Sequence, residues 1–373
     1  MASVHKRTSD LTGAVSWQVK YRTPEGRPRA RTFRLKRDAD RFARDVETSK
    51  DAGGFVDPQR AEVTVTEWTT RWLEAKANLK PSTRERYEGA IRAHIEPRWA
   101  NVKLSGLRHE DVQDWLSGLD RSPATIRKTH RILSQALDYA VKARRLSSNP
   151  AKGVSLPRVE QAAPRYLTHA QVDQLAGTIG EEWRLLVLFL AYTGLRWGEV
   201  AALRVSRLDL LRRRIIVAES VTPIRGVMVW GTPKGHERRE VPLPQFLARE
   251  LEAHIAGLDA AALVFTGPRG AVLRSTTFRD AALAAAAKRV RVPGFHPHEF
   301  RHTAASLAIA SGADVKVVQQ MLGHKSATMT LDLYGHLFPD RLDVVADALE
   351  AAREAALAPS ANPDVPESFP RAS

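Results

Sequence analysis

Hydrophobic and polar positions change period within the first fifty residues. Apolar side chains alternate with polar ones over residues 14–21, at Val15, Trp17, Val19 and Tyr21, and they alternate again over residues 30–35. Turn-forming residues at 24–26 separate the two runs, as in paired strands. Over residues 37–50 the apolar positions recur at helical spacing instead. The pattern predicts a small sheet backed by one helix.

Between residues 63 and 150 the pattern is helical throughout. We expect Thr66 to cap a helix that carries Trp68 and Trp72, and Pro81 to open a second helix. Two further helices are predicted over residues 109–116 and 123–144. Residues 53–58 have the composition of a linker between this helical part and the predicted sheet.

From residue 158 onward the pattern is mixed. An apolar helix over 183–192 precedes strand-like segments at 214–218, 226–232 and 238–243, and helical spacing then returns. This order predicts an α+β unit that is mainly helical. A polar, proline-punctuated tail ends the chain and is expected to be disordered. The expected domains are therefore a sheet-and-helix domain at 1–55, a helical domain at 63–150, an α+β domain at 160–352 and a tail at 355–373.

Composition points to a polyanionic partner. The 373 residues carry a net charge of +15, and the first 37 residues alone hold ten Lys or Arg against two acids. A basic strand ribbon and basic helices suit DNA, although a charged surface without a partner is the alternative. The absence of cysteine excludes disulfides and a cysteine nucleophile. The longest apolar patch, residues 185–192, is too short to span a bilayer, so we expect a soluble cytoplasmic protein without membrane partners.

One short helical stretch is compatible with two different kinds of site. His298, Glu299 and His302 have the H-E-x-x-H spacing of a zinc site, whereas His298 and Arg301 form a pair suited to a phosphate. A zinc site of this type needs a third ligand, but the glycine expected after His302 is missing and no Glu occurs from residue 300 to 340. Zinc also leaves the permanent charge of Arg301 unexplained. We therefore favour a phosphate site without a metal, with Glu299 and His302 in supporting positions.

Three more motifs carry candidate chemistry. Arg196 and Glu199 are three residues apart, so the carboxylate can brace the guanidinium as a phosphate fork, although a surface ion pair has the same spacing. Lys234 lies between two strand-like segments, where we expect the tip of a hairpin. Asp314 and Ser326 are expected to be N-caps and Gly323 a C-terminal stop. His324 is therefore expected at a helix junction, with Tyr334 ten residues further on. Each motif alone is weak, and a tyrosine on an amphipathic helix is more often part of a core.

Together these residues resemble the tyrosine recombinases, the phage integrase family. The order and spacing of Arg196, Lys234, the His298-x-x-Arg301 pair, the Leu322-Gly-His324 motif and Tyr334 match the family pattern over about 140 residues. The helical segment at 63–150 resembles the family's core-binding (SAM-like) domain, and the resemblance implies that 160–352 is the catalytic domain. The basic N-terminal segment resembles the arm-binding domain of the longer phage and mobile-element integrases.

The resemblance implies cleavage and rejoining of DNA through a 3′-phosphotyrosine, without ATP or a metal cofactor. Tyr334 would be the nucleophile, and Arg196 and Arg301 would stabilise charge on the phosphate. Lys234 would protonate the 5′-oxygen, and His298 would exchange the tyrosine proton. The remaining two predicted site residues are His324, which would bind the phosphate, and Glu199, which would orient Arg196.

The expected partners are double-stranded attachment sites, on which the chain would act as a homotetramer in a bacterial host. A directionality factor and a host DNA-bending protein are further expected partners. A type IB topoisomerase and a catalytically silent DNA-binding protein remain alternative functions, and relaxation of a plasmid without a specific site would identify the former. The residues predicted to contact DNA are Arg22, Arg29, Arg31, Arg127, Lys128 and Arg131.

Overall fold

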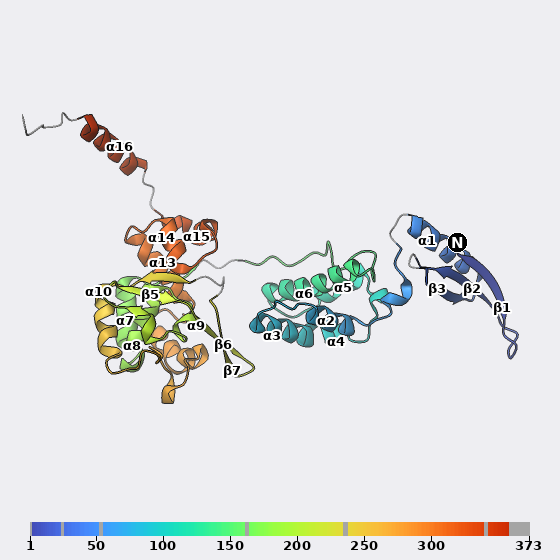
Figure 1. Ribbon diagram of the computed structural model, residues 1–373, viewed down its shortest axis with the longest axis horizontal. Coiled ribbons are helices and arrows are strands. Elements are labelled where there is room, and N and C mark those ends of the chain that lie inside the picture. The colour runs from blue at the N-terminus through green and yellow to red at the C-terminus, as the bar shows by residue number, and fades with distance from the viewer. Residues whose placement is uncertain are drawn as a thin grey trace, which may run out of the picture. The chain divides into compact units, whose positions relative to one another are not determined.

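The chain divides into two compact units. The computed structural model describes residues 2–23, 26–51, 55–160, 164–233, 238–338 and 342–357. One unit comprises Met1–Ala162 with Ile224–Val227, and the other comprises Ala163–Pro223 with Met228–Ser373. Figure 1 shows strands only at the start of the first unit and a mixture of strands and helices in the second.

The first unit begins with the predicted sheet. Strands β1 (Ser3–Thr8), β2 (Val15–Arg22) and β3 (Pro28–Phe33) pair antiparallel in the order β1-β2-β3, and helix α1 (Lys36–Asp51) packs on one face. The apolar residues of β2 that alternate in the sequence point toward α1, where Val19 and Tyr21 are buried beside Phe42. Strand β1 is an addition to the expected pair, since Ser3–Thr8 has a single apolar residue and too little alternation to reveal a strand.

Helices form the rest of the first unit. They are α2 (Val65–Glu74), α3 (Pro81–Ala90), α4 (Glu96–Trp99), α5 (His109–Ser117) and α6 (Pro123–Lys142). The N-cap predicted at Thr66 is wrong by two residues. Thr64 is the N-cap instead, because its hydroxyl accepts from Glu67 N while the Glu67 carboxylate accepts from Thr64 N. Apolar side chains from these helices, including Trp68, Trp72 and Trp99, meet in one core.

The second unit combines helices with two small sheets. Strands β4 (Leu208–Asp209), β5 (Arg214–Val217) and β8 (Arg239–Pro242) form one sheet in the order β4-β5-β8, and β6 (Ser220–Ile224) pairs with β7 (Val227–Gly231). The helices are α7 (His169–Thr178), α8 (Glu181–Thr193), α9 (Trp197–Val200), α10 (Gln245–His254), α11 (Ser275–Phe278), α12 (Ala284–Arg289), α13 (Glu299–Ala310), α14 (Val315–Leu322), α15 (Ala327–Tyr334) and α16 (Leu342–Leu357).

The core of the second unit surrounds α8, which is apolar on nearly every side. Phe189 and Leu190 are buried there, and α7, α10 and α13 pack against the helix. A helix that is apolar all round requires such surroundings. The N-caps Asp314 and Ser326 and the left-handed stop at Gly323 are present as predicted. A smaller apolar cluster joins α13, α14 and α15 around Tyr334.

The expected hairpin around residue 234 is wrong. Strands β7 and β8, which flank this segment, belong to different sheets, because β7 pairs with β6 and β8 pairs with β5. Strand β6 was not expected, and its Pro223 and neighbouring polar residues give it no regular alternation. Within the described residues, no helix is both long enough and apolar enough to cross a membrane.

Candidate active site

The first predicted motif lies where α8 ends. Gly194 closes that helix in the left-handed region, with φ of 63°, and Arg196 begins α9 as its N-cap. The Glu199 carboxylate accepts from the Arg196 backbone N at 2.8 Å and from Arg196 NH1 at 3.0 Å. The carboxylate side chain is only 1% exposed, so this is a buried ion pair rather than the surface pair that the spacing alone allows. Glu199 thus holds Arg196 in one orientation.

Arg301 lies on the first turn of α13 and is 4% exposed. Its NH1 donates to Gly194 O at 2.9 Å and its NH2 donates to Leu322 O. Burial, followed by the charge of Arg196, lowers the pKa of Arg301 to about 9, so the guanidinium stays charged at neutral pH. Two protein carbonyls therefore fix a buried cation, and its remaining N–H groups are available to an anion.

A pocket of about 320 Å³ opens beside these two arginines. Arg196, His298 and Arg301 contribute to its wall, so the structure brings together three of the predicted site residues. The full lining is Leu195, Arg196, Trp197, Ser275, Arg279, His296, Pro297, His298 and Arg301. Two fixed guanidiniums and an imidazole around one cavity form a site suited to a phosphodiester.

Both predicted histidines are held neutral. His298 is the N-cap of α13, and burial together with the nearby His302 and Arg301 lowers its pKa to about 4. Burial, followed by the charges of Arg301 and Arg196, lowers the pKa of His324 to about 4 as well. The His324 Nδ1 lies 2.9 Å from the Thr330 hydroxyl of α15. A neutral imidazole at neutral pH can accept a proton.

Tyr334 ends α15 beside the pocket and does not line it. Its side chain is 1% exposed, and burial raises the pKa of its hydroxyl to about 12. The hydroxyl lies 2.8 Å from His302 Nδ1, and the phenol ring is stacked parallel to the His324 ring. The His302 ring in turn meets the His298 ring edge to face, with centroids 5.4 Å apart. A row of imidazoles thus connects the tyrosine hydroxyl to the pocket wall.

Glu299 takes no part in this row. Its carboxylate accepts two hydrogen bonds from Arg165 at 2.6 and 2.9 Å and a third from His296 N at 2.7 Å. Glu299 therefore ties the start of α13 to the segment before α7, which is the supporting position expected for it. Across the described ranges, no three His, Cys, Asp or Glu side chains are grouped so that they could hold a metal ion.

The other predicted residues have different surroundings. Lys234 lies outside the described residues. Arg22 is exposed on the open face of the N-terminal sheet, whereas Arg29 and Arg31 pair with Tyr21 and Val19 and so lie on the face that α1 covers. The three cations predicted on α6 are all exposed on one side of that helix: Arg127, Lys128 and Arg131.

Sequence reasoning missed Arg239, which donates to Glu199 from NH1 at 2.9 Å and from NH2 at 2.6 Å. It lies on β8, where it has the same parity as the fully buried Val241. A cation at an inward position of a strand is unusual, because burying an unpaired charge is costly. That parity was the signal that could have revealed Arg239. The pocket residues Ser275, Arg279 and His296 were also missed, and no motif distinguishes them.

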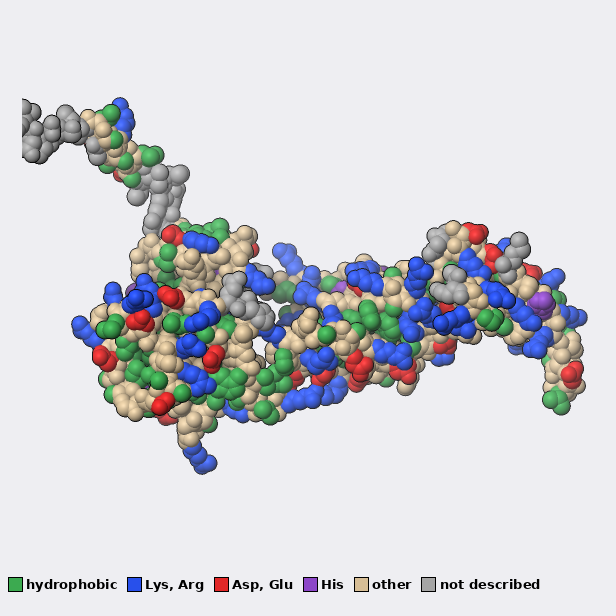
Figure 2. Space-filling model, viewed as in Figure 1, with side chains coloured by type: hydrophobic (Ala, Val, Ile, Leu, Met, Phe, Trp, Pro, Cys, Tyr) green, Lys and Arg blue, Asp and Glu red, His purple; other side chains and the backbone are tan. Residues whose placement is uncertain are grey.

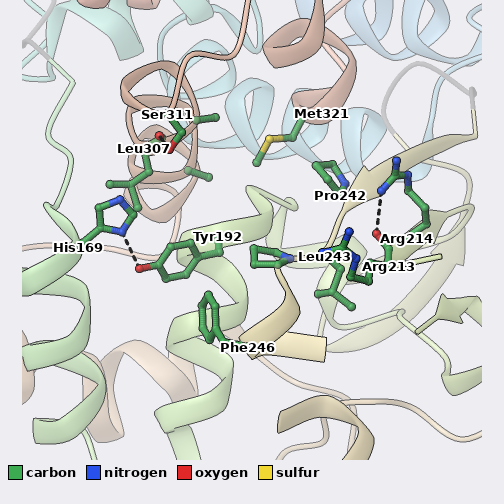
Figure 3. A pocket seen from close by; sticks show the side chains of 13 residues that line it. His169, Tyr192, Arg213, Arg214, Pro242, Leu243, Phe246, Leu307, Ser311 and Met321 are labelled. Atoms are coloured by element: carbon green, nitrogen blue, oxygen red, sulfur yellow. Dashed lines mark hydrogen bonds between the residues drawn. The ribbon is translucent and has the colours of Figure 1, made fainter. Parts of the chain in front are cut away.

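A second pocket of about 390 Å³ lies in the same unit (Figure 3). His169 and Tyr192 are joined there by a hydrogen bond of 2.8 Å, and Phe246 lies below the tyrosine ring. Most of the lining is apolar, and none of the residues predicted to be catalytic contributes to it. We therefore take the first pocket as the candidate active site.

Comparisons with known proteins point to one family. Residues 165–341 match the model of the Phage integrase family, and residues 64–119 match that of the Phage integrase N-terminal SAM-like domain. The integrase of Mycobacterium phage FRAT1 is 28% identical over 285 residues, which cover 72% of this chain and 83% of the relative. A tyrosine recombinase of Thermosipho africanus is 27% identical over 269 residues, covering 69% and 89%.

Solved structures show the same fold. The Tn1549 transposon integrase in complex with transposon right end DNA gives a TM-score of 0.65 at 21% identity, covering 78% of this chain and 100% of that one. A lambda integrase tetramer bound to a Holliday junction gives 0.55 at 19% identity, covering 87% and 96%. Fold, site and relatives together define a site-specific recombinase. The chain belongs to the phage integrase family of tyrosine recombinases.

Proposed function

We propose that this recombinase is the integrase of a phage or other mobile element and that it cuts DNA with Tyr334. The observation that carries the proposal is the pair of fixed guanidiniums, Arg196 and Arg301, around one pocket, with the tyrosine hydroxyl held next to it. A protein that only bound DNA would have no use for buried, oriented cations beside a buried tyrosine. Phosphoryl transfer requires such groups, because negative charge builds on the phosphate oxygens in its transition state.

In the proposed step, the Tyr334 oxygen attacks the scissile phosphorus and forms a phosphotyrosine at the 3′ end. The bond between phosphorus and the 5′-oxygen breaks. The oxygen keeps the electron pair of that bond and accepts a proton from Lys234. Arg196 and Arg301 hold the two non-bridging oxygens, and His324 donates a further hydrogen bond to the phosphate. Rejoining is the reverse reaction, in which a 5′-hydroxyl attacks and tyrosine leaves. The bond energy is kept in the ester, so the step needs no nucleotide.

The phenol needs a base, because burial raises its pKa to about 12. We propose that His298 takes the proton, since it is neutral and faces the pocket, where the negative charge of a bound phosphate would raise its pKa from about 4. His302 stands between them, with its Nδ1 on the tyrosine hydroxyl. The variants His298→Gln and His302→Gln show which of the two histidines is the base. Replacing the base should change the pH dependence of the cleavage rate, whereas replacing the other histidine should lower the rate at every pH.

The nucleophile is tested by trapping. A nicked half-site releases a short 5′-hydroxyl strand after cleavage, so the protein stays joined to the DNA and migrates as an adduct in a denaturing gel. We expect the wild type to form the adduct and Tyr334→Phe to form none. Tyr192→Phe, at a tyrosine in the second pocket, is the matched control and is expected to leave the adduct intact. An adduct in Tyr334→Phe would overturn the assignment.

DNA contact by the N-terminal sheet is part of the proposal. The open face of this sheet carries Arg7, Lys20 and Arg22, all exposed, and Figure 2 shows Lys and Arg side chains gathered over this region. Two of the earlier candidates suit DNA less well. Arg29 is bonded to Asp57 at 2.8 Å, and the Arg31 guanidinium lies over the ring of Phe42. We therefore assign the DNA-facing role to the open face of the sheet.

Helix α6 offers a second DNA-facing surface. Arg127, Lys128 and Arg131 are exposed at positions three and four residues apart, so they form one stripe along the helix. Such a stripe suits successive phosphates of a duplex, and it would add affinity rather than sequence choice.

We propose a homotetramer on DNA as the active form, by analogy with the lambda integrase tetramer bound to a Holliday junction. Helix α16 supports assembly, because Leu349 and Leu357 are 67% and 64% exposed and would be covered in an oligomer. The proposed setting is the cytoplasm of a bacterial host, where a directionality factor and a DNA-bending protein would assist. Light scattering on the protein with and without attachment-site DNA would test the assembly.

A further inference from the structure

The C-terminal end of α14 is surrounded by arginines. Its last two carbonyls and the carbonyl of its cap accept one hydrogen bond each, every one from a different guanidinium. Arg239 donates to Met321 O at 3.1 Å, Arg301 donates to Leu322 O, and Arg196 donates to Gly323 O at 3.1 Å. The carbonyls at a helix C-terminus have no helical partner and carry partial negative charge, so cations are favourable there. His324 follows directly after this end.

Two of these arginines line the pocket and the third does not. Arg239 is absent from the pocket wall, and its side chain is 11% exposed. Its fork bonds both oxygens of Glu199, while its Nε holds α14. The stem packs so tightly that a Cβ on Gly323 would come within 2.9 Å of Arg239 Cδ. Arg239 is therefore fixed at three points without reaching the space that a phosphate would occupy.

The charge balance explains why a third arginine is useful. Glu199 paired with Arg196 alone would cancel the charge of the guanidinium that faces the pocket. With Arg239 present, the buried Glu199 carboxylate is shared by two cations. The three side chains together then retain a net positive charge beside Arg301. Burial alone would raise the pKa of Glu199, but the hydrogen bonds and charge of Arg239, followed by the charge of Arg196, lower it. The carboxylate thus stays ionised as a rigid brace.

We propose that Arg239 is a positioning residue for strand cleavage. It acts through Glu199, which it shares with Arg196, and through the end of α14, which precedes His324. Its contribution is to keep Arg196 oriented and the pocket cationic. The inference rests on the proposed function, since it concerns the same phosphate site.

The test measures adduct formation on the nicked half-site in a single turnover, with DNA affinity measured separately. Removing a pre-organised donor costs roughly 10²–10³ in rate, so for a residue that acts through another we expect Arg239→Gln to lose about 10- to 100-fold with little change in affinity. Arg239→Lys keeps the charge without the fork and is expected to fall between the wild type and Arg239→Gln. Arg184→Gln is the matched control, because Arg184 also forks onto a glutamate, Glu250, in the same unit. It is expected to cleave at the wild-type rate.

A second variant separates charge from folding. In Arg239→Gln the Glu199 carboxylate is left with Arg196 alone, so adding Glu199→Gln removes the excess negative charge and should recover part of the rate. A purely structural role predicts that the double variant is as slow as the single variant or slower, and that result would overturn the proposal. A rate for Arg239→Gln within twofold of the wild type would overturn it too. An adduct that survives Tyr334→Phe would instead reject the nucleophile, and the Arg239 comparison would still be readable.

Discussion

The arginines of the pocket and those of the N-terminal sheet differ in how they are held. Arg301 is 4% exposed and bonded to two carbonyls, and Arg196 is braced by a buried carboxylate. Arg22, by contrast, is exposed, and its only described bond is to the neighbouring Gly26 carbonyl. A fixed cation in a dry site stabilises charge at one point, whereas a mobile one in water attracts phosphates anywhere along a strand. Residues of the same type thus suit chemistry in one place and affinity in the other.

The largest expected effect concerns the pocket. Arg301→Ala should lower the single-turnover cleavage rate by roughly 10²–10³, because it removes a fixed cation that would stabilise the transition state. Affinity for duplex DNA should change far less, since the exposed cations remain. Rates from denaturing gels and affinities from fluorescence anisotropy measure the two quantities. Equal losses in both would show that the pocket arginines act mainly by binding and would remove the contrast.

The rigidity of the pocket is tested at Gly194. A Cβ there would lie 2.8 Å from Leu322 Cδ2 and 3.0 Å from the Ala304 Cβ, and φ is already left-handed. Gly194→Ala should therefore lower the free energy of unfolding by about 2–4 kcal/mol, combining backbone strain with overpacking. Gly257→Ala is the matched control, because its φ is 78° with nothing within 4 Å of the added Cβ. It should cost only about 1–2 kcal/mol. Equal losses in chemical denaturation would mean that the close packing contributes nothing.

The N-terminal sheet should respond in affinity alone. Arg22→Gln should weaken binding to duplex DNA a few-fold and reduce the slope of log K against log salt by about 0.9, the value for one lost phosphate contact. Arg31→Gln should leave this slope unchanged, because the Arg31 guanidinium lies over the rings of Phe33 and Phe42 on the other face of the sheet. Salt titrations of the full chain measure both variants. The reverse order would place DNA on the other face of the sheet.

A further expected effect is on stability against pH. His298 and His324 have a pKa of about 4 in the folded chain, below their ordinary value of 6.5. The unfolded chain therefore binds more protons between these limits, so stability is complete above about pH 6.5 and falls as the pH drops toward 4. Thermal melting across this range should show the fall. The double variant His298→Gln, His324→Gln should flatten it, and an unchanged slope would show that other groups cause it.

Several features of the fold were predictable because they depend on neighbours in sequence. The alternation in β2 placed Val19 and Tyr21 on one face, and the apolar run over 183–192 predicted the helix α8. Asp314, Ser326 and Gly323 were recognisable as caps because a cap is a local arrangement. Strand β1 and the partners of β7 and β8 were not predictable, since pairing between strands depends on distant segments.

The sequence by itself determined the residue types and the order of the site. Arg196, Arg301 and Tyr334 could be selected because their spacing resembles a family pattern, and the brace from Glu199 to Arg196 spans only three residues. Tertiary structure alone decided that Arg239 shares Glu199, that His302 holds the tyrosine hydroxyl, and that three arginines meet at the end of α14. These contacts join residues that are 21 to 127 positions apart. A buried charge must be paired with a partner, and in this site the partners are far apart in the sequence. A local sequence pattern therefore cannot predict which residues pair.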